Sequence, residues 1–481
     1  MSTPAAIDPR RWKALAVLGV AYLMVVLDIS IVNVALPSIQ TDLGFAPEDL
    51  HWVVSGYALT FGGFLLLGGR AGDILGRRIV FMVGLAAFAA FSLLAGLATS
   101  PEMLIVARLL QGAAGAILSP SVFSMTLVLF EEGAARNKAL GILGGIAGSG
   151  AAIGVLLGGV LTQYIGWEWI FYVNVPIGLA ALALVPRVMS ESKADGLAKH
   201  FDSLGAVTVT GSLMLLVFGL TQTSNVGWGS LQTIGVLAGS VALMAAFLVI
   251  EARSRSPLVP LGFFRRRTPT GANIIGLLLG TMVFGMFFLL SLYMQQVLGW
   301  SAMKTGVAYL AVALTAVVAS GVSQALVTRA GVKPILAVGM GLIGAGLAYF
   351  TQISPQGSYV GDLLPGFLLI GVGLGFSFVP VSIAALAGIG GREAGLASGL
   401  INTSQQVGGA LGLAVLTTVS TTRTENLLAD GASPATALTD GFTLAFWVGV
   451  AVAVGSVIAT LIALRGKDLE VPKDAPAPAA A

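Results

Sequence analysis

The amino-acid sequence predicts an all-α polytopic membrane protein whose helices cross a lipid bilayer fourteen times. Three observations support this prediction: the composition, the number of long apolar stretches and the distribution of basic residues. The chain has 481 residues, of which 56% are hydrophobic and only 10% are charged. A soluble domain is about one quarter charged, and this chain has too few polar side chains to cover a globule in water. We therefore expect lipid to be its solvent.

Fourteen apolar stretches are the candidate spans, because a helix needs about 20 apolar residues to cross the hydrocarbon core. Turn-forming segments separate them, as at Pro37, at Thr99-Ser100-Pro101 and at Ser354-Pro355-Gln356-Gly357. The sixth stretch is short, and we expect it to extend toward Met189. The predicted spans are residues 14–36, 51–69, 79–98, 103–129, 139–164, 171–186, 204–222, 230–250, 272–298, 305–328, 335–352, 363–389, 394–421 and 441–464.

The basic residues predict the orientation. An even number of spans places both termini on one side of the membrane. If that side is the cytoplasm, every lysine and arginine lies in a cytoplasmic segment except Lys304 and Arg423, which lie outside, and Arg108, which lies within a span. This is a strong positive-inside pattern. We therefore expect cytoplasmic termini and a multi-pass protein of the bacterial cytoplasmic membrane.

A weak internal repeat predicts the domain organisation. The segment 40–44 after the first span corresponds to 295–299 after the ninth, and 70–73 after the second corresponds to 329–333 after the tenth. The common offset predicts two six-helix bundles, spans 1–6 and 9–14, with spans 7–8 inserted; such bundle repeats are typical of secondary transporters. The predicted domains are a first bundle at residues 1–190, a two-helix insert with a cytoplasmic loop at 191–271, a second bundle at 272–464 and a disordered cytoplasmic tail at 465–481.

The composition also disfavours several classes of function. The chain has no cysteine and only two histidines, so it lacks the usual ligands of a thiolate or histidine metal centre. It has no P-loop, no nucleophile–base pair in a span, and no basic block with interleaved aromatic residues that would indicate nucleic-acid binding. We expect no enzyme activity, no cofactor, no metal and no nucleic-acid partner. The expected partners are the lipid bilayer, protons and a small-molecule substrate, and the expected state is a monomer.

Only two charged side chains lie within the predicted spans, Asp28 and Arg108. A charge at bilayer depth costs about 2.5–3.5 kcal/mol, so it is retained mainly where it has a function. At 1.5 Å per residue, Asp28 lies about 12 Å and Arg108 about 7–8 Å from the outer ends of their spans, so the two depths allow contact. We predict that Asp28 binds and releases a proton, with Arg108 and Gln111 as its coupling partners. The alternative is a static ion pair that fixes helix packing.

Uncharged polar residues in the spans are candidates for the wall of a substrate cavity. Asn402 and Gln406 are four residues apart and share a helix face, which suits a cavity wall as well as interhelical hydrogen bonds worth about 0.6–2 kcal/mol. A single acid among the spans suits monovalent or neutral substrates better than divalent ones. The predicted substrate-lining residues are Asp28, Asn33, Asn402, Gln405 and Gln406.

The loop after the second span predicts an inner gate. The positive-inside rule explains the basic residues in this cytoplasmic loop, but it does not explain the acidic Asp73 among them. Glycines in the same loop allow tight turning and close helix approach, and opposite charges would lock the gate in the outward-facing state. The predicted gate residues are Gly69, Arg70, Asp73, Gly76, Arg77 and Arg78.

The fifth span is rich in glycine at four-residue spacing, which places small residues on one helix face and allows close packing. This face is either a flexing seam between the two bundles or a packing surface alone. The predicted hinge residues are Gly145, Gly154, Gly158 and Gly159.

Four segments resemble a known family. The segment Gly69–Arg78 resembles the loop-2/3 motif of the major facilitator superfamily, and three others resemble signatures of its fourteen-span drug:proton antiporter branch: Leu27–Pro37, Arg108–Gly112 and Gly166–Pro176. The resemblance extends over essentially the whole chain and implies the major facilitator fold. The sequence departs from the branch at two positions within the spans: Val155 stands where a proline is expected, and Gln405 where an arginine is common.

The resemblance implies a proton-coupled secondary active exporter of amphipathic or cationic small molecules. Such a drug:proton antiporter works by alternating access and would confer multidrug efflux and antibiotic resistance. The first alternative is a dedicated exporter of a single metabolite, antibiotic or lipid with the same fold. Proton-coupled uptake and a transport-inactive membrane receptor are the remaining alternatives.

Overall fold

The computed structural model describes residues 10–46, 49–130, 134–191, 202–221, 226–227, 229–254, 257, 259, 261–387, 389 and 394–464. Within these ranges the regular elements are all helices, and there is no strand. The predicted tail at 465–481 lies outside the described residues.

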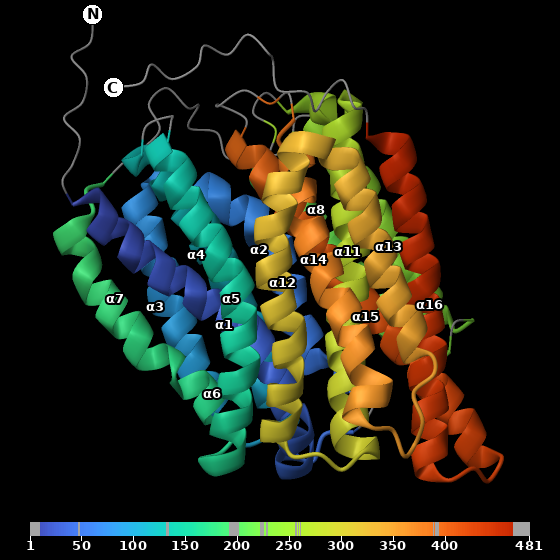
Figure 1. Cartoon of the computed structure of the whole chain (residues 1–481). Helices are drawn as coiled ribbons and strands as arrows, with labels where there is room; N and C mark the ends of the chain where they lie inside the picture. The colour runs from blue at the N-terminus through green and yellow to red at the C-terminus, as the bar shows by residue number, and fades with distance from the viewer. Residues whose placement is uncertain are drawn as a thin grey trace, which may run out of the picture.

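The helices from α1 to α7 form one group, drawn from blue through teal to green in Figure 1. α2 packs along α4, α1 along α5, and α3 lies against both α4 and α7. These helices enclose an apolar core of their own, which includes Phe81, Phe88 and Leu118. The elements are α1 (Arg11–Leu43), α2 (Trp52–Leu75), α3 (Arg77–Gly96), α4 (Pro101–Leu129), α5 (Ala134–Tyr164), α6 (Trp169–Tyr172) and α7 (Asn174–Val188).

The remaining helices form a second group, drawn from green to red in Figure 1, in which α11 packs along α15, and α14 packs along α12 and α13. Two π-helical turns, η2 and η3, lie at the end of α11 and the start of α14. The elements are α8 (Ser203–Thr221), α10 (Leu231–Arg253), η1 (Leu261–Arg265), α11 (Arg267–Leu292), η2 (Tyr293–Val297), α12 (Ala302–Ala330), α13 (Val332–Phe350), η3 (Tyr359–Leu363), α14 (Leu364–Ala385), α15 (Ala394–Ala429) and α16 (Pro434–Ala463).

Serine residues begin several of these helices. The side chains of Ser100, Ser301 and Ser433 accept hydrogen bonds from backbone N–H groups three residues later, at 3.3, 3.2 and 3.3 Å. Such N-caps satisfy donors that have no partner inside the helix, and each contributes about 1 kcal/mol. A proline follows two of them, at the first helical position, where its missing N–H costs nothing. These signals explain where α4, α12 and α16 begin.

Within the described residues each predicted span lies largely on a helix or on consecutive helical segments, and several helices, such as α1 and α2, extend beyond the apolar stretch. The prediction that the first span ends at Pro37 is wrong, because α1 continues through this proline to Leu43. The hydroxyl of Thr41 donates to the carbonyl of Pro37 at 2.9 Å in that last turn. An apolar stretch marks the hydrocarbon core, whereas backbone hydrogen bonding continues into the polar interface.

Ten helices of the described chain are long and apolar enough to cross a bilayer, and shorter apolar helical stretches lie within α2, α5 and α8. The chain is therefore a multi-pass helical protein. The ten helices are Arg11–Leu43, Arg77–Gly96, Pro101–Thr126, Trp169–Val188, Leu231–Arg253, Arg267–Val297, Ala302–Val327, Val332–Phe350, Tyr359–Ala385 and Pro434–Ala463.

The two groups of helices meet along α2 and α15 and along α5 and α12, and hydrogen bonds join the end of α1 to η2. Glycines bring α5 and α12 into backbone contact: a Cβ added at Gly306 would lie 2.8 Å from the carbonyl oxygen of Val155. At the end of α1, the Gln296 amide donates to Gln40 Oε1 at 2.9 Å. Both glutamines belong to the repeated segments, so the fold brings these two parts of the repeat together.

Candidate functional site

A cluster of polar side chains lies inside the first group of helices, where the surrounding residues are apolar. Its members come from four different helices, and each is at most 1% exposed. Because buried polar groups are costly unless they are hydrogen-bonded, their contacts show what holds the cluster together. The members are Asp28 of α1, Ser92 of α3, Arg108 and Gln111 of α4, and Asn174 of α7.

Arg108 makes the central contacts of the cluster. Its Nη1 donates to Asp28 Oδ2 at 2.5 Å, and its Nε donates to the backbone carbonyl of Val53 in α2 at 2.9 Å. The guanidinium also lies over the rings of Tyr57 and Phe171, 4.4 and 5.5 Å from their centres. The planar fork of arginine suits such simultaneous contacts, and one side chain thereby links α1, α2 and α4.

The second carboxylate oxygen of Asp28 is held by two amides. Gln111 Nε2 donates to Oδ1 at 2.7 Å, and Asn174 Nδ2 donates to the same oxygen at 3.2 Å. Both amides also donate to the hydroxyl of Ser92 at 2.9 Å, and the Gln111 Oε1 accepts from Arg108 at 2.7 Å. Both oxygens of the ionised carboxylate therefore accept hydrogen bonds. An added proton would turn one of its oxygens from an acceptor into a donor and break this pattern.

The structure brings together the three residues predicted from sequence for proton coupling, Asp28, Arg108 and Gln111. Sequence reasoning missed Ser92 and Asn174 as members of the cluster. A signal for Asn174 was present, since an amide inside an apolar span needs a partner. Ser92 gave no such signal, because serine occurs in many membrane helices without a special role.

A cavity of about 170 Å³ lies between the two groups of helices. Of the predicted lining residues, Asn402, Gln405 and Gln406 line it, whereas Asp28 and Asn33 do not. Asp28 is turned into the polar cluster, and the Asn33 amide donates back to the carbonyl of Ile29 at 3.2 Å. The cavity is lined by Tyr22, Val25, Val26, Ile29, Phe61, Ser119, Gly280, Val283, Phe284, Phe378, Asn402, Gln405 and Gln406.

The predicted inner gate lies at the turn between α2 and α3. The side chains of Arg70 and Asp73 lie outside the described residues, so their predicted ion pairs stay a prediction. Gly76 makes the turn with a φ of +114°. The carboxylate of Glu191, which follows α7, accepts from the backbone N–H groups of Arg78 and Ile79 at 3.1 and 3.2 Å.

Glu191 was not predicted to take part in this turn. Its carboxylate also lies 4.0 Å from Arg78 Nε, and the first N–H groups of a helix carry the positive end of the helix dipole. An acid at this position therefore holds the start of α3 to the end of α7. Gly69 and Arg77 lie on the same turn region, on α2 and at the first residue of α3.

The glycine face of α5 packs inside the first group of helices and does not form the seam between the two groups. A Cβ added at Gly154 would lie 2.0 Å from Ser30 Oγ, and one at Gly158 would lie 2.6 Å from the carbonyl oxygen of Ile31. Both contacts are to α1. Among the described members of the predicted set, only Gly159 faces the other group: a Cβ added there would lie 2.9 Å from the carbonyl oxygen of Ala302. Gly145 lies on α5, but its surroundings are outside the described residues.

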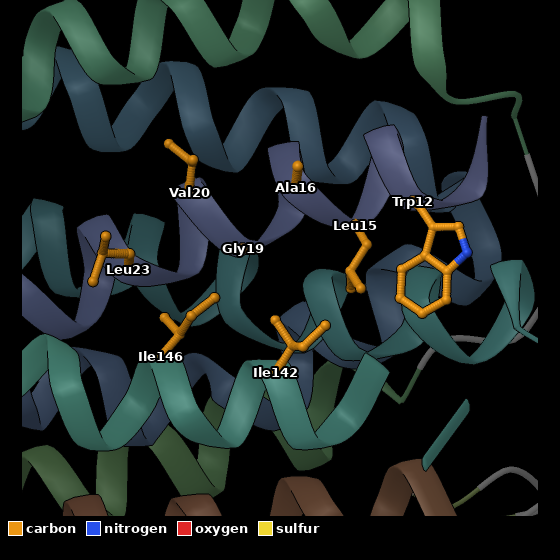
Figure 2. Close-up of a pocket in the computed structure, with 8 residues that line it drawn as sticks. All are labelled: Trp12, Leu15, Ala16, Gly19, Val20, Leu23, Ile142 and Ile146. Carbon is orange, nitrogen blue, oxygen red and sulfur yellow. The ribbon is translucent and has the colours of Figure 1, made fainter. Parts of the chain in front are cut away.

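A second hollow, of about 250 Å³, lies between the first turns of α1 and the start of α5 (Figure 2). The lining side chains are apolar except for the indole N–H of Trp12, and Trp12, Val20 and Ile142 are about two-fifths exposed. It therefore offers none of the convergent polar groups that orient a ligand. Its lining residues are Trp12, Leu15, Ala16, Gly19, Val20, Leu23, Ile142 and Ile146.

Comparison with known proteins places the chain in a family. The family model of the Major Facilitator Superfamily matches residues 18–413. The puromycin resistance protein of Streptomyces alboniger is 40% identical over 459 residues, which are 95% of this chain and 91% of the relative. The cephamycin export protein of Amycolatopsis lactamdurans is 41% identical over 423 residues, 87% of each chain. A multidrug transporter protein of Bacillus subtilis is 30% identical over 410 residues, 85% of this chain and 75% of the relative.

The fold has counterparts among solved structures. A bacterial homologue of the human lysosomal transporter Spinster superposes with a TM-score of 0.68 at 15% sequence identity, and the match covers 97% of this chain and 99% of that one. This likeness concerns the fold alone. The extent of the family match and the closeness of the curated relatives show that the chain belongs to the Major Facilitator Superfamily, as a multi-pass membrane transporter whose homologues are antibiotic-resistance and drug-export proteins.

Proposed function

We propose that this protein is a proton-coupled secondary active exporter of amphipathic small molecules, cationic ones included, and that it works as a drug:proton antiporter by alternating access. The observation that carries the proposal is the buried cluster around Asp28. A fully buried carboxylate at membrane depth is costly, and this one is held by a cation and two amides. Asp28 is thus the group that we assign to proton binding, with Arg108 and Gln111 as its coupling partners.

α1 provides a physical connection between proton and substrate. It carries Asp28 on one face and three residues of the cavity wall, Val25, Val26 and Ile29, on another. Protonation of Asp28 would remove its attraction to Arg108 and release one of the ties between α1 and α4. A shift of α1 would then change the cavity wall. Proton binding and substrate binding would in this way favour different positions of the same helix.

The architecture that we propose for this function has fourteen spans. Spans 1–6 and 9–14 form two six-helix bundles, α8 and α10 are the inserted helices, and both termini face the bacterial cytoplasm. The start of α1 and the end of α16 lie on the same face of the helices, which is the arrangement expected for an even number of spans (Figure 1). The positive-inside pattern supports the same orientation. We propose a monomer whose partners are lipid, protons and the exported small molecule.

The test uses purified protein in liposomes with an imposed inside-acid pH gradient. The probes are puromycin, a cephamycin and a fluorescent lipophilic cation, and accumulation is compared between wild type and Asp28→Asn. Gradient-driven accumulation of any probe that is lost in the variant is the expected result. Accumulation by the wild type that ignores the gradient would contradict proton antiport, and an unaffected variant would remove Asp28 from the mechanism.

The second candidate is a dedicated exporter of one compound, built on the same fold and the same proton site. The names of two relatives favour it, because each relative is named for a single antibiotic. The same liposome assay separates the two candidates. A multidrug exporter moves several unrelated probes with comparable efficiency, whereas a dedicated exporter moves one of them and leaves the others at background.

A further inference from the structure

We infer that the cavity between the two groups of helices selects uncharged ring compounds that carry hydrogen-bonding groups, and that Gln406, together with Gln405, determines this selectivity. The inference rests on the proposed function, because it names the substrate class of the same transport site. It narrows the proposed cargo to the uncharged members of that class and excludes the cationic ones.

The described part of the cavity wall carries no charge. None of the residues that line it is acidic or basic, and four of them are aromatic, each from a different helix. The polar members are hydroxyl groups and the three side-chain amides of α15, at Asn402, Gln405 and Gln406. These amides lie at helical positions i, i+3 and i+4, so they share one face of α15. The aromatic residues are Tyr22, Phe61, Phe284 and Phe378.

Asp28 does not supply the missing charge in this conformation. The wall residues of α1 are Val25, Val26 and Ile29, and at 100° per residue Asp28 lies about 110° away from the centre of that face. Its carboxylate is 0% exposed, and both of its oxygens already accept hydrogen bonds inside the first group of helices. Among the residues that the structure describes, a cation in the cavity would therefore have no counter-ion within hydrogen-bond reach.

The balance of forces disfavours a charged guest. Moving an ion from water into a cavity without a counter-charge carries a desolvation penalty that exceeds the attraction of an aromatic face for a cation. An uncharged ring has no such penalty, and its burial against aromatic walls is favourable. The cavity of about 170 Å³ is close to the roughly 150 Å³ that accommodates a benzene molecule in a protein interior. In this conformation it holds one ring or a small ring system.

The amide of Gln406 indicates which polar groups the ligand carries. Its Oε1 is buried, and it has no hydrogen-bond partner among the residues that the structure describes. A buried acceptor without a partner is rare in proteins, so a ligand with a hydroxyl or N–H group would satisfy it. Gln406 also packs against α2, because a Cβ added at Gly62 would lie 3.2 Å from its Cβ. This contact places the amide at the junction between the two groups of helices.

The test measures equilibrium binding to purified protein in lipid nanodiscs, without any pH gradient. One probe is a dihydroxynaphthalene, and the other is the same ring with a trimethylammonium group in place of one hydroxyl. We expect wild type to bind the neutral probe at least about tenfold more tightly, and Gln406→Leu to weaken that binding by about tenfold through loss of a hydrogen bond. Gln406→Glu introduces a carboxylate of the same shape, and it should reduce or reverse the preference.

The matched control is Gln163→Glu, the same chemical change at an exposed residue of α5, which should leave both affinities unchanged. Gln405→Glu is a second charge-adding variant in case Gln406→Glu fails to fold. Equal or tighter binding of the cation by wild type overturns the inference. So does an absence of neutral-probe binding, or an unchanged preference in the glutamate variants. Because binding needs no gradient, failure of proton coupling in the Asp28→Asn assay is a separate result.

Discussion

Replacing Arg108 by methionine removes the cation of the buried cluster and tests whether Asp28 and Arg108 depend on each other. Arg108 is 1% exposed and donates hydrogen bonds to Asp28, to Gln111 and to the carbonyl of Val53. Breaking a buried ion pair by removing one partner costs about 3–5 kcal/mol, because the other charge stays buried without compensation. We therefore expect Arg108→Met to lower the free energy of unfolding by about this amount.

The double variant Asp28→Asn with Arg108→Met provides the decisive comparison. Asparagine keeps an acceptor oxygen for Gln111 and Asn174, and methionine fills the space beside the ring of Tyr57. Replacing both members of a buried pair by uncharged residues of similar volume is often neutral or stabilising. We expect the double variant to unfold within about 1 kcal/mol of wild type. It should nevertheless show no gradient-driven transport, because the proposed proton site is gone.

The assay is reversible unfolding in mixed SDS micelles, followed by tryptophan fluorescence. The exposed Arg329 at the end of α12 provides the control, since Arg329→Met should change the free energy by no more than about 0.5 kcal/mol. The loss of unfolding free energy in Arg108→Met should also become smaller as the pH falls, because the Asp28 carboxyl group needs no counter-ion once it is protonated. A loss below about 1 kcal/mol in Arg108→Met, or a double variant as unstable as the single one, would refute the idea of a coupled buried pair.

Three further predictions concern packing and gating. Gly158→Ala should destabilise the protein by about 1–3 kcal/mol, because the added methyl group meets a backbone carbonyl of α1. Gly321 has open space around it, so the control Gly321→Ala should raise or preserve the melting temperature. Equal changes of melting temperature in the two variants would contradict close packing at Gly158. Glu191→Gln should weaken the start of α3 by about 0.5–2 kcal/mol. Faster hydrogen exchange at the first turn of that helix is the expected sign, and unchanged exchange would count against the contact. Gln296→Leu should remove the amide contact to Gln40 and increase labelling of a cysteine introduced at the neighbouring exposed Thr41, which is a clean probe because the chain has no cysteine. Equal labelling with and without Gln296→Leu would contradict the idea that this contact holds the end of α1 against η2.

The positions of the spans were determined by local properties of the sequence. Long apolar stretches and serine N-caps identify the helices, because backbone groups in lipid must be hydrogen-bonded within the same segment. The ends were less predictable. Pro37 lacks a backbone N–H, and yet α1 continues past it, because tertiary packing can override a local preference. The sequence also singled out Asp28 and Arg108, since each charge stands alone in an apolar stretch.

Only the tertiary structure decided which way these side chains face. Asp28 was predicted both to exchange protons and to line the cavity, but the rotation of α1 turns it toward Arg108 and away from the cavity wall. Likewise, the glycines of α5 pack mainly on α1, although their spacing suited a seam between bundles equally well. Sequence spacing shows which residues share a face of one helix. Which neighbour that face meets depends on contacts between segments far apart in the chain, and no local sequence pattern records those contacts.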